Sequence, residues 1–237
     1  MGVITSPSQF RPAGPPDLAS ARYAADLNET ESMGSLSSPL RSPDQTLAAL
    51  FWNSTTPAYL WSHVAVELGQ RHHLTLSENS RLLALSYLAM ADAAIACWDA
   101  KYHYVFWRPV TAIPLADTDG NPATVADPAW VPLFATPAFP EYPSGHSTVS
   151  SAAAAVLEAF FGATDFTMDS DFMPGVVRSF GSFSAALDEV LEARVFAGIH
   201  FRSACQDGRT TGADVAGYVL EQALQRVHGF DEDAGQH

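Results

Sequence analysis

The hydrophobic and polar positions of this 237-residue chain recur mainly at helical spacing, and the expected helices open on recognisable capping residues. The run Ser42-Pro43-Asp44-Gln45 combines an N-cap, a proline at the first helical position and a capping-box glutamine, which predicts a short helix through Trp52. Thr56-Pro57 repeats the pair of N-cap and proline and predicts a second helix to about Gly69.

The longest predicted helix covers residues 77–107. Thr75 and Glu78 form a capping box before it, and neither proline nor glycine interrupts the sequence until Pro109. The stretch from Leu82 to Trp98 is apolar nearly all round, which is typical of a helix in the middle of a bundle. Because this stretch contains an aspartate and is shorter than the roughly 20 residues that cross a bilayer, we interpret it as a buried helix and expect no membrane span.

Three further helices are predicted, over residues 145–161, 184–198 and 210–228. Residues 114–143 hold seven prolines and predict a long ordered loop before the first of these helices. The alternation typical of strands is nowhere sustained, and no internal repeat is visible. The fold class is therefore predicted to be all-α, with a bundle of about six to seven helices.

The beginning of the chain differs in composition from the rest. Residues 1–41 are rich in proline, serine and glycine without a sustained apolar period. We predict an extended N-terminal arm over residues 1–41 with few regular elements, laid over a helical catalytic domain formed by residues 42–237.

Composition and charge narrow the classes of function. The chain has 12 basic and 26 acidic residues, a net charge of −14, so most of its surface repels nucleic acid, which is excluded as a partner. With 47% hydrophobic and 16% charged residues, the chain is not mainly disordered. Lys101 is the single lysine. In so acidic a protein, basic residues that lie close together indicate a specific role for that group of residues.

Cysteine usage and the first residues say little about location. Cys97 and Cys205 lack metal-ligand spacing and are too few for a disulfide framework. Residues 1–20 lack the basic start and apolar centre of a signal peptide. We therefore expect a cytoplasmic location unless a longer form is exported, and a homo-oligomer is left open.

Lys101 and Arg108 lie seven residues apart, about two turns, so the predicted helix places both cations on one face. Burial of two cations on an apolar helix is costly. A binding site for an anion and two snorkelling side chains at a helix end explain the pair equally well.

The run Pro143-Ser144-Gly145-His146-Ser147 lies where the proline-rich loop becomes a helix, so its first amides are unsatisfied donors at the positive end of the helix dipole, which is typical of an anion site. An ordinary serine N-cap with a surface histidine is the alternative.

Arg194 and His200 are six residues apart and share one side only if the helix ends near Gly198. An ion pair for Arg194 and a helix C-cap for His200 explain them as well.

Together, the three segments supply cations, helix amides and two histidines, the groups that hold a tetrahedral oxyanion and move its protons. The segments 101–109, 143–146 and 194–200 resemble, in order and internal spacing, three signature motifs shared by vanadium-dependent haloperoxidases and type 2 phosphatidic acid phosphatases. The neighbouring segment 91–99 is similar to the bacterial haloperoxidase-like branch.

The resemblance implies a vanadate-binding set of Lys101, Arg108, Ser144, Gly145, Arg194 and His200. It further implies that His200 bonds the vanadium, that His146 is the acid–base residue and that Lys101 assists catalysis. Hydrogen peroxide would oxidise a halide to hypohalous acid while vanadium stays at its highest oxidation state and acts as a Lewis acid. An organic acceptor for the halogen is left open.

Two alternatives use the same residues. In a soluble acid phosphatase, phosphate occupies the site, His200 attacks phosphorus and His146 protonates the leaving alcohol. Trp98 and Phe139 favour the peroxidase, because they stand where chloroperoxidase-like members place aromatic residues beside the halide. The third interpretation is an inactive oxyanion-binding or assembly subunit.

The chain departs from the third motif at two positions. Ala193 and Ala204 replace a serine and an aspartate, so Asp207 or a backbone carbonyl is expected to orient His200. The chain is also shorter than typical haloperoxidases and resembles their motif-bearing C-terminal half.

Overall fold

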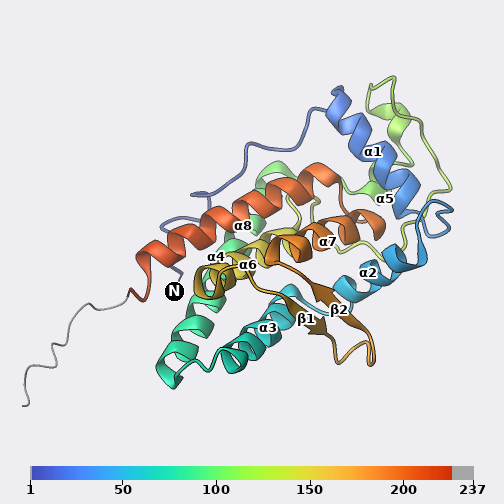
Figure 1. The fold of residues 1–237 in the computed structure, drawn as a ribbon. Coiled ribbons are helices and arrows are strands. Elements are labelled where there is room, and N and C mark those ends of the chain that lie inside the picture. The colour runs from blue at the N-terminus through green and yellow to red at the C-terminus, as the bar shows by residue number, and fades with distance from the viewer. Residues whose placement is uncertain (1, 226–237) are drawn as a thin grey trace, which may run out of the picture.

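A helix made largely of small residues lies at the centre of the bundle in the computed structural model, which describes residues 2–225 (Figure 1). This helix, α6 (Gly145–Phe161), packs against α4 (Leu76–Tyr104), α8 (Arg202–Gln222), α7 (Phe183–Phe196) and α3 (Pro57–Arg71). A Cβ atom on Gly212 of α8 would lie 2.1 Å from the carbonyl oxygen of Thr148, so α8 crosses α6 at backbone contact. The all-α prediction is confirmed.

Helix α4 carries the long apolar stretch through the bundle. It begins on the predicted capping box of Thr75 and Glu78 and buries Leu82, Leu85 and Ala89 completely. The segment Leu76–Ala112 is long and apolar enough to cross a membrane by length and composition, and 50% of its most apolar stretch is buried inside the protein. A core helix of a bundle passes the same test, so this finding is weak evidence for a membrane span.

Helix α4 ends at Tyr104 rather than at residue 107. Val105 adopts a left-handed conformation with φ 48° and ψ 43°. The rings of Phe106 and Trp107 then pack 6.2 and 6.4 Å from the ring of Tyr23. Tertiary packing of two aromatic side chains thus ends the helix at a place where the sequence has no proline or glycine.

The segment predicted as an extended arm contains helix α1 (Ala21–Gly34), capped by Ser20. The expectation of few regular elements is wrong here. Tyr23 and Leu27, one turn apart, are fully buried, and the ring of Tyr23 lies 6.0 Å from that of Phe201. The apolar face of α1 is short, so its stability comes from this distant contact rather than from a local pattern.

The two helices predicted next are found with small shifts at their ends. Helix α2 (Pro43–Asn53) has the predicted capping box, and α3 extends to Arg71. The proline-rich loop contains only the four-residue α5 (Pro109–Ala112) at its entrance and the short 3-10 helix η1 (Ala116–Thr118) among its described residues.

Two strands occur that the sequence did not predict. β1 (Phe166–Asp169) pairs antiparallel with β2 (Val177–Phe180). Phe166 faces Phe180 across the pair, and Phe166 packs 6.0 Å from the ring of Trp61. Strands of four residues are too short to show a period, and burial against the helices stabilises them.

Helix α7 lies close to its predicted range, whereas α8 begins at Arg202 rather than at residue 210. The first turns of α8 are polar and contain Gly208, which hid their helical character. The predicted end of this helix at residue 228 lies outside the described residues.

Candidate active site

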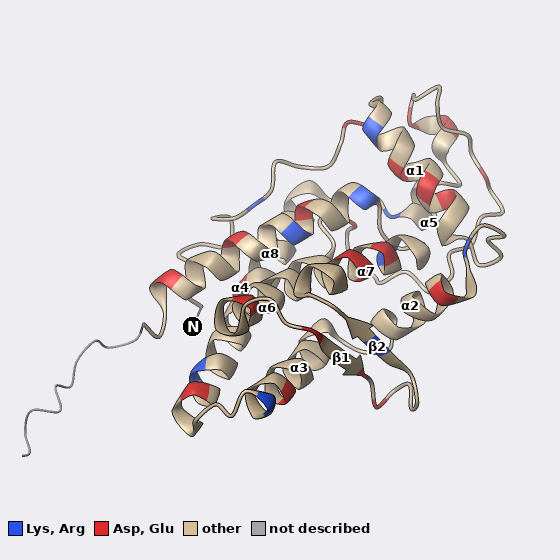
Figure 2. Cartoon of the chain, viewed as in Figure 1, with Lys and Arg blue, Asp and Glu red and all other residues tan. Residues whose placement is uncertain are grey.

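Three cationic side chains are buried in one region of the molecule, although acidic residues outnumber basic ones in most helices (Figure 2). Lys101 in the last turn of α4 is 0% exposed, Arg108 is 6% exposed, and Arg194 in the last turn of α7 is 1% exposed. Burial of cations without a compensating negative charge is costly, so their gathering indicates a site for an anion.

Arg108 does not share a helix with Lys101, as the sequence analysis expected. It lies beyond the end of α4 and is the N-cap of α5, with extended backbone angles of φ −81° and ψ 155°. Its Nη1 donates to the carbonyl of Ile199 at 2.7 Å, and its Nε donates to the carbonyl of Phe139 at 3.0 Å. Its Nη2 is buried without a partner.

The ammonium group of Lys101 is held by the loop before α6. Its Nζ donates to the carbonyl oxygens of Pro140, Glu141 and Pro143 at 2.9, 2.8 and 2.5 Å. Burial lowers the pKa of Lys101 to about 8. Because its three protons are directed at carbonyls, Lys101 organises this loop and adds positive charge behind the site, and its expected direct contact with an anion stays a prediction.

Arg194 points into the site from α7. Its one long hydrogen bond, from Nη1 to the carbonyl of Trp52, measures 3.5 Å, and its Nε is buried without a partner. Burial lowers the pKa of Arg194 to about 10. This guanidinium therefore keeps donors available for a ligand.

His200 lies between a carboxyl group and a guanidinium. Its Nδ1 is 3.0 Å from Oε1 of Glu141, and its Nε2 is 3.1 Å from Nη1 of Arg108. These partners assign the proton to Nδ1 and leave a lone pair on Nε2. Burial, followed by the charges of Arg108 and Lys101, lowers the pKa of His200 well below 6.5, so the imidazole is neutral.

Glu141 is the functional residue that the sequence analysis missed. Its Oε1 also accepts from the amide of Phe201 at 2.9 Å, and burial raises the pKa of its carboxyl group to about 7. Asp207, the side chain expected to orient His200, instead accepts from the hydroxyl of Tyr142 at 2.6 Å, so that expectation is wrong. The available signal was a carboxylate in the proline-rich loop three residues before Ser144.

The start of α6 forms another side of the site. Ser144 is its N-cap, as predicted, and its Oγ accepts from the amide and hydroxyl of Ser147 at 3.4 and 3.2 Å. The first amides of the helix, those of Gly145 and His146, have no acceptor within the helix. Nε2 of His146 is buried without a partner, and burial followed by the charge of Arg194 lowers the pKa of His146 well below 6.5.

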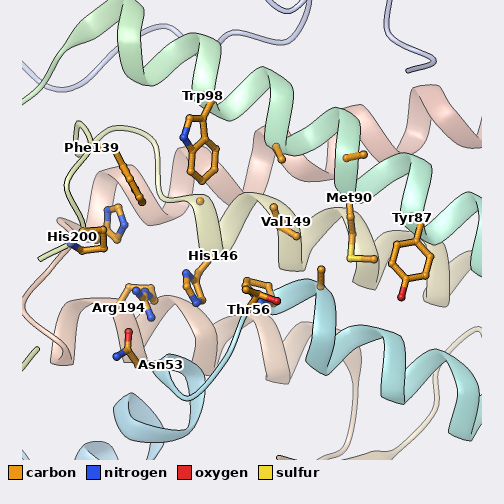
Figure 3. A pocket seen from close by; sticks show the side chains of 16 residues that line it. Asn53, Thr56, Tyr87, Met90, Trp98, Phe139, His146, Val149, Arg194 and His200 are labelled. Carbon is orange, nitrogen blue, oxygen red and sulfur yellow. The ribbon is translucent and has the colours of Figure 1, made fainter. Parts of the chain in front are cut away.

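Trp98 and Phe139 stand together beside the cations. Their ring centroids are 5.2 Å apart, and Nζ of Lys101 lies 5.8 Å from the ring of Trp98 and 5.2 Å from that of Phe139. Both rings line a pocket with His146, Arg194 and His200 (Figure 3). Lys101, Arg108 and Ser144 are not among the residues that line this pocket.

The donor set fits a tetrahedral oxyanion. Oε2 of Glu141 is buried without a partner, and so are three nitrogen atoms of this cluster: Nη2 of Arg108, Nε of Arg194 and Nε2 of His146. The two guanidinium nitrogens can donate to an anion, and Nε2 of His146 can donate to it or accept from its protonated form, beside the positive end of α6. Within residues 2–225, no group of three His, Cys, Asp or Glu side chains is placed to hold a metal ion.

Comparison with known proteins gives concordant results. A family model described as the VCPO second helical-bundle domain matches residues 81–229. Vanadium chloroperoxidase from Curvularia inaequalis is 31% identical over 182 residues, which cover 63% of this chain and 29% of that protein.

Two solved structures share the fold. A bacterial vanadium-dependent iodoperoxidase has a TM-score of 0.80 and 32% identity, and the match covers 93% of this chain and 55% of that chain. A holo-type bacterial vanadium-dependent chloroperoxidase has a TM-score of 0.68 and 18% identity, and the match covers 92% and 52%. The chain thus spans about half the length of these structures and a smaller share of the fungal protein.

Proposed function

The chain belongs to the family of the VCPO second helical-bundle domain, and from this premise we propose that it binds vanadate and oxidises a halide with hydrogen peroxide. The observation that carries the proposal is the cluster of three buried cations, two neutral histidines and one helix N-terminus in a chain of net charge −14. An oxyanion with several negative charges neutralises this cluster and satisfies its unpartnered donors.

Each residue has a distinct task in this proposal. Arg108 and Arg194 donate to the oxygens of the anion through Nη2 and Nε, and the amides of Gly145 and His146 donate from the start of α6. Nε2 of His200 would be the ligand of the metal, a role that requires the neutral imidazole.

Glu141 orients His200 through Nδ1 and keeps the lone pair of Nε2 directed at the site. Because one lone pair cannot serve two partners, Nε2 of His200 would bind the anion in place of its contact with Nη1 of Arg108. Lys101 holds the loop that carries Glu141 and contributes its charge.

When bound, vanadate supplies a Lewis acid that polarises the bond between the two oxygens of peroxide. His146 is placed at the pocket wall with a free Nε2, where it takes up and returns a proton. The reaction consumes one halide ion, one hydrogen peroxide and one proton and yields hypohalous acid and water. The halide loses the two electrons that the peroxide gains.

Trp98 and Phe139 support halide oxidation over ester hydrolysis, because they cover the cationic end of the pocket with an aromatic, weakly hydrated surface. The phosphatase alternative is supported by the neutral Nε2 of His200, which is also the form that attacks phosphorus.

The test compares two reactions on one preparation. The protein is stripped of bound anions and assayed for oxidation of iodide, bromide and chloride by hydrogen peroxide, with and without vanadate, beside hydrolysis of a phosphate monoester. We expect halide oxidation that requires vanadate, is inhibited by phosphate and is lost in H200A.

Two other outcomes overturn the proposed function, and a third overturns the role given to His200. Ester hydrolysis without halide oxidation assigns the phosphatase. Vanadate binding with neither reaction assigns an inactive oxyanion-binding subunit. Halide oxidation that survives H200A removes His200 from the mechanism.

A further inference from the structure

Helix α4 carries an exposed stripe of uncharged side chains along one side. The α4 stripe consists of Tyr87, Ala91, Ile95, Trp98 and Tyr102, which are all exposed and follow one another at steps of three or four residues. Side chains at this spacing share one face of a helix. Figure 3 shows Tyr87 and Trp98 projecting from the same side of α4.

The N-terminal segment packs beside the α4 stripe and leaves it open. The amides of Val3 and Ile4 donate to Oδ2 of Asp92 at 2.6 and 2.9 Å. Further along the helix, Arg11 pairs with Asp99 at 2.8 Å. These contacts hold the segment against the flank of α4, and the five side chains of the stripe stay exposed within the described chain.

The α4 stripe, which lies wholly within the described residues, carries no charged side chain. Since the chain has a net charge of −14, most of its surface repels another copy of the same chain. Asp99, which follows Trp98 in the sequence, is already paired with Arg11. At the stripe, therefore, two copies can meet without bringing like charges together.

The exposed area of the stripe suits a reversible contact. Tyr87, Trp98 and Tyr102 are 53%, 37% and 63% exposed. At about 200 Å² for an aromatic side chain, these three rings leave about 300 Å² open to solvent. A stable dimer buries about 800 Å² on each partner, of which the rings supply more than a third. We expect a dimer that dissociates on dilution rather than a permanent one.

The order of side chains along the α4 stripe is self-complementary. Ala91 and Trp98 lie equally far from the midpoint of the stripe on opposite sides, and so do Tyr87 and Tyr102. In an antiparallel pair with a two-fold axis at the midpoint, the indole of Trp98 in each copy meets the small side chain of Ala91 in the other. Tyr87 of each copy meets Tyr102 of the other. Large side chains opposite small ones let two helices interdigitate, so the pattern favours a second copy over an unrelated partner.

We propose that the α4 stripe binds the α4 stripe of a second copy of this chain in an antiparallel, two-fold dimer. Tyr87, Ala91 and Trp98 also line the pocket of the candidate active site, so the second copy lies along the rim of that pocket. The dimer requires neither the anion nor the reaction of the proposed function, and its test is independent of both.

Charged side chains at position 95 test the contact. Ile95 lies beside the proposed two-fold axis and does not line the pocket. Sedimentation velocity over a range of concentrations compares the wild type with I95E and I95K. We expect each variant to need at least a tenfold higher concentration than the wild type to dimerise, because two like charges meet at the axis. An equimolar mixture of I95E and I95K should restore the dimer, since opposite charges then meet.

V66E on α3 is the matched control for I95E. Val66 is 43% exposed, Ile95 is 44% exposed, and Val66 lies outside the α4 stripe. V66E adds the same charge to the chain and should dimerise like the wild type. Circular dichroism should show the same helix content in all variants. A loss of dimer in V66E equal to that in I95E would assign the effect to net charge and overturn the proposal.

Cysteines at the two tyrosine positions test the antiparallel register. The axes of packed helices lie about 8–10 Å apart, and a bis-maleimide of matching reach is added to Y87C, to Y102C and to their mixture. The mixture should cross-link. Each variant alone should not, because its two cysteines lie about 22 Å apart along the helix axis at about 1.5 Å per residue. The wild type should not cross-link either, since Cys97 and Cys205 are buried.

Other results overturn the proposal. A wild type that stays a monomer at every concentration removes a second copy as the occupant of the stripe. A dimer that survives both I95E and I95K uses another surface, and cross-linking of Y87C with itself contradicts the antiparallel register. Binding of the monomeric wild type, but not of I95E, to phosphatidylcholine vesicles would assign the stripe to a membrane surface instead.

Discussion

Oε1 of Glu141 lies 3.0 Å from Nδ1 of His200, and both side chains are buried. The pair joins the proline-rich loop to the segment after α7, across 59 residues of sequence. It determines which nitrogen of His200 is free to meet a ligand.

Removal of this carboxyl group should weaken vanadate binding. E141A leaves Nδ1 of His200 without its acceptor, and loss of such an outer partner typically costs about 10- to 100-fold in affinity. Calorimetric titration with vanadate measures the effect. D207A is the control, because Asp207 contacts Tyr142 and Arg22 but not His200, and its affinity should stay unchanged. Equal losses in both variants would show that Glu141 has no special role.

A cation buried without a partner should destabilise the anion-free protein. R194M removes a guanidinium with one long hydrogen bond, and replacement of buried charge by an apolar side chain stabilises proteins by roughly 1–4 kcal/mol in favourable cases. We expect R194M to unfold at a higher urea concentration than the wild type. Vanadate should then stabilise the wild type, by about 2.7 kcal/mol at 100 times Kd, and leave R194M unaffected.

Arg178 provides the control for this experiment. It pairs with Asp44 and Glu189, does not line the pocket, and is partly exposed. R178M should therefore not gain stability and should keep the response to vanadate. A rise in stability in R178M equal to that in R194M would contradict the explanation by unpaired burial.

Gly198 should be required for the position of His200. It has φ +72°, and a Cβ atom there would lie 2.4 Å from the carbonyl oxygen of Gly34 and 2.9 Å from Pro132. G198A therefore adds a clash to the left-handed strain of about 1–2 kcal/mol. Gly120 has φ +74°, and no atom lies within 4 Å of a Cβ atom built there. G120A therefore measures the left-handed strain without a clash.

Urea denaturation and vanadate titration of both variants test this prediction. G198A should lose more stability than G120A and should also lose vanadate affinity, since α1 and α7 would be forced apart beside the site. Equal effects on stability would mean that the contact with Gly34 is unimportant.

Acid should destabilise the anion-free protein through its buried histidines. The pKa values of His146 and His200 are lowered well below 6.5 by burial and by nearby cations. Below about pH 6.5 the unfolded chain binds protons that the folded chain does not, so the free energy of unfolding falls as pH falls, by up to about 1.4 kcal/mol per pH unit for each histidine.

Urea denaturation between pH 5 and 8 measures this slope. H146Q removes one of the two groups and should flatten the decline below pH 6.5. The carboxyl group of Glu141 has a pKa raised to about 7, so between its ordinary pKa and pH 7 it makes the free energy of unfolding rise as pH falls. Because wild type and H146Q both contain Glu141, this contribution does not affect their comparison. Parallel curves for wild type and H146Q would refute the prediction.

Much of the helical fold was predictable because its signals are local. Ser42 and Thr75 cap helices α2 and α4 through residues three positions away, and the small residues of α6 follow directly on its N-cap. The candidate site residues other than Glu141 were named from the sequence, since they lie in or near three short segments whose spacing resembles a known family, and their roles stay predictions. Only the tertiary structure shows that these residues lie in one cluster.

The local signals failed where distant contacts decide the backbone. Val105 ends α4 without a proline or glycine because Phe106 and Trp107 pack on Tyr23 of α1. Helix α1 itself has too short an apolar face to be recognised alone, and it is held by contacts such as that with Phe201.

The sequence by itself determined the helices, their caps and the types of residue available for chemistry, because these depend on neighbours within about one turn. Only the tertiary structure decided that Glu141 rather than Asp207 holds His200. It also decided that the ammonium group of Lys101 donates to backbone carbonyls, whereas Nε of Arg194 stays without a partner. Burial, charge and hydrogen-bond partners depend on residues far apart in the chain, and folding alone brings these together.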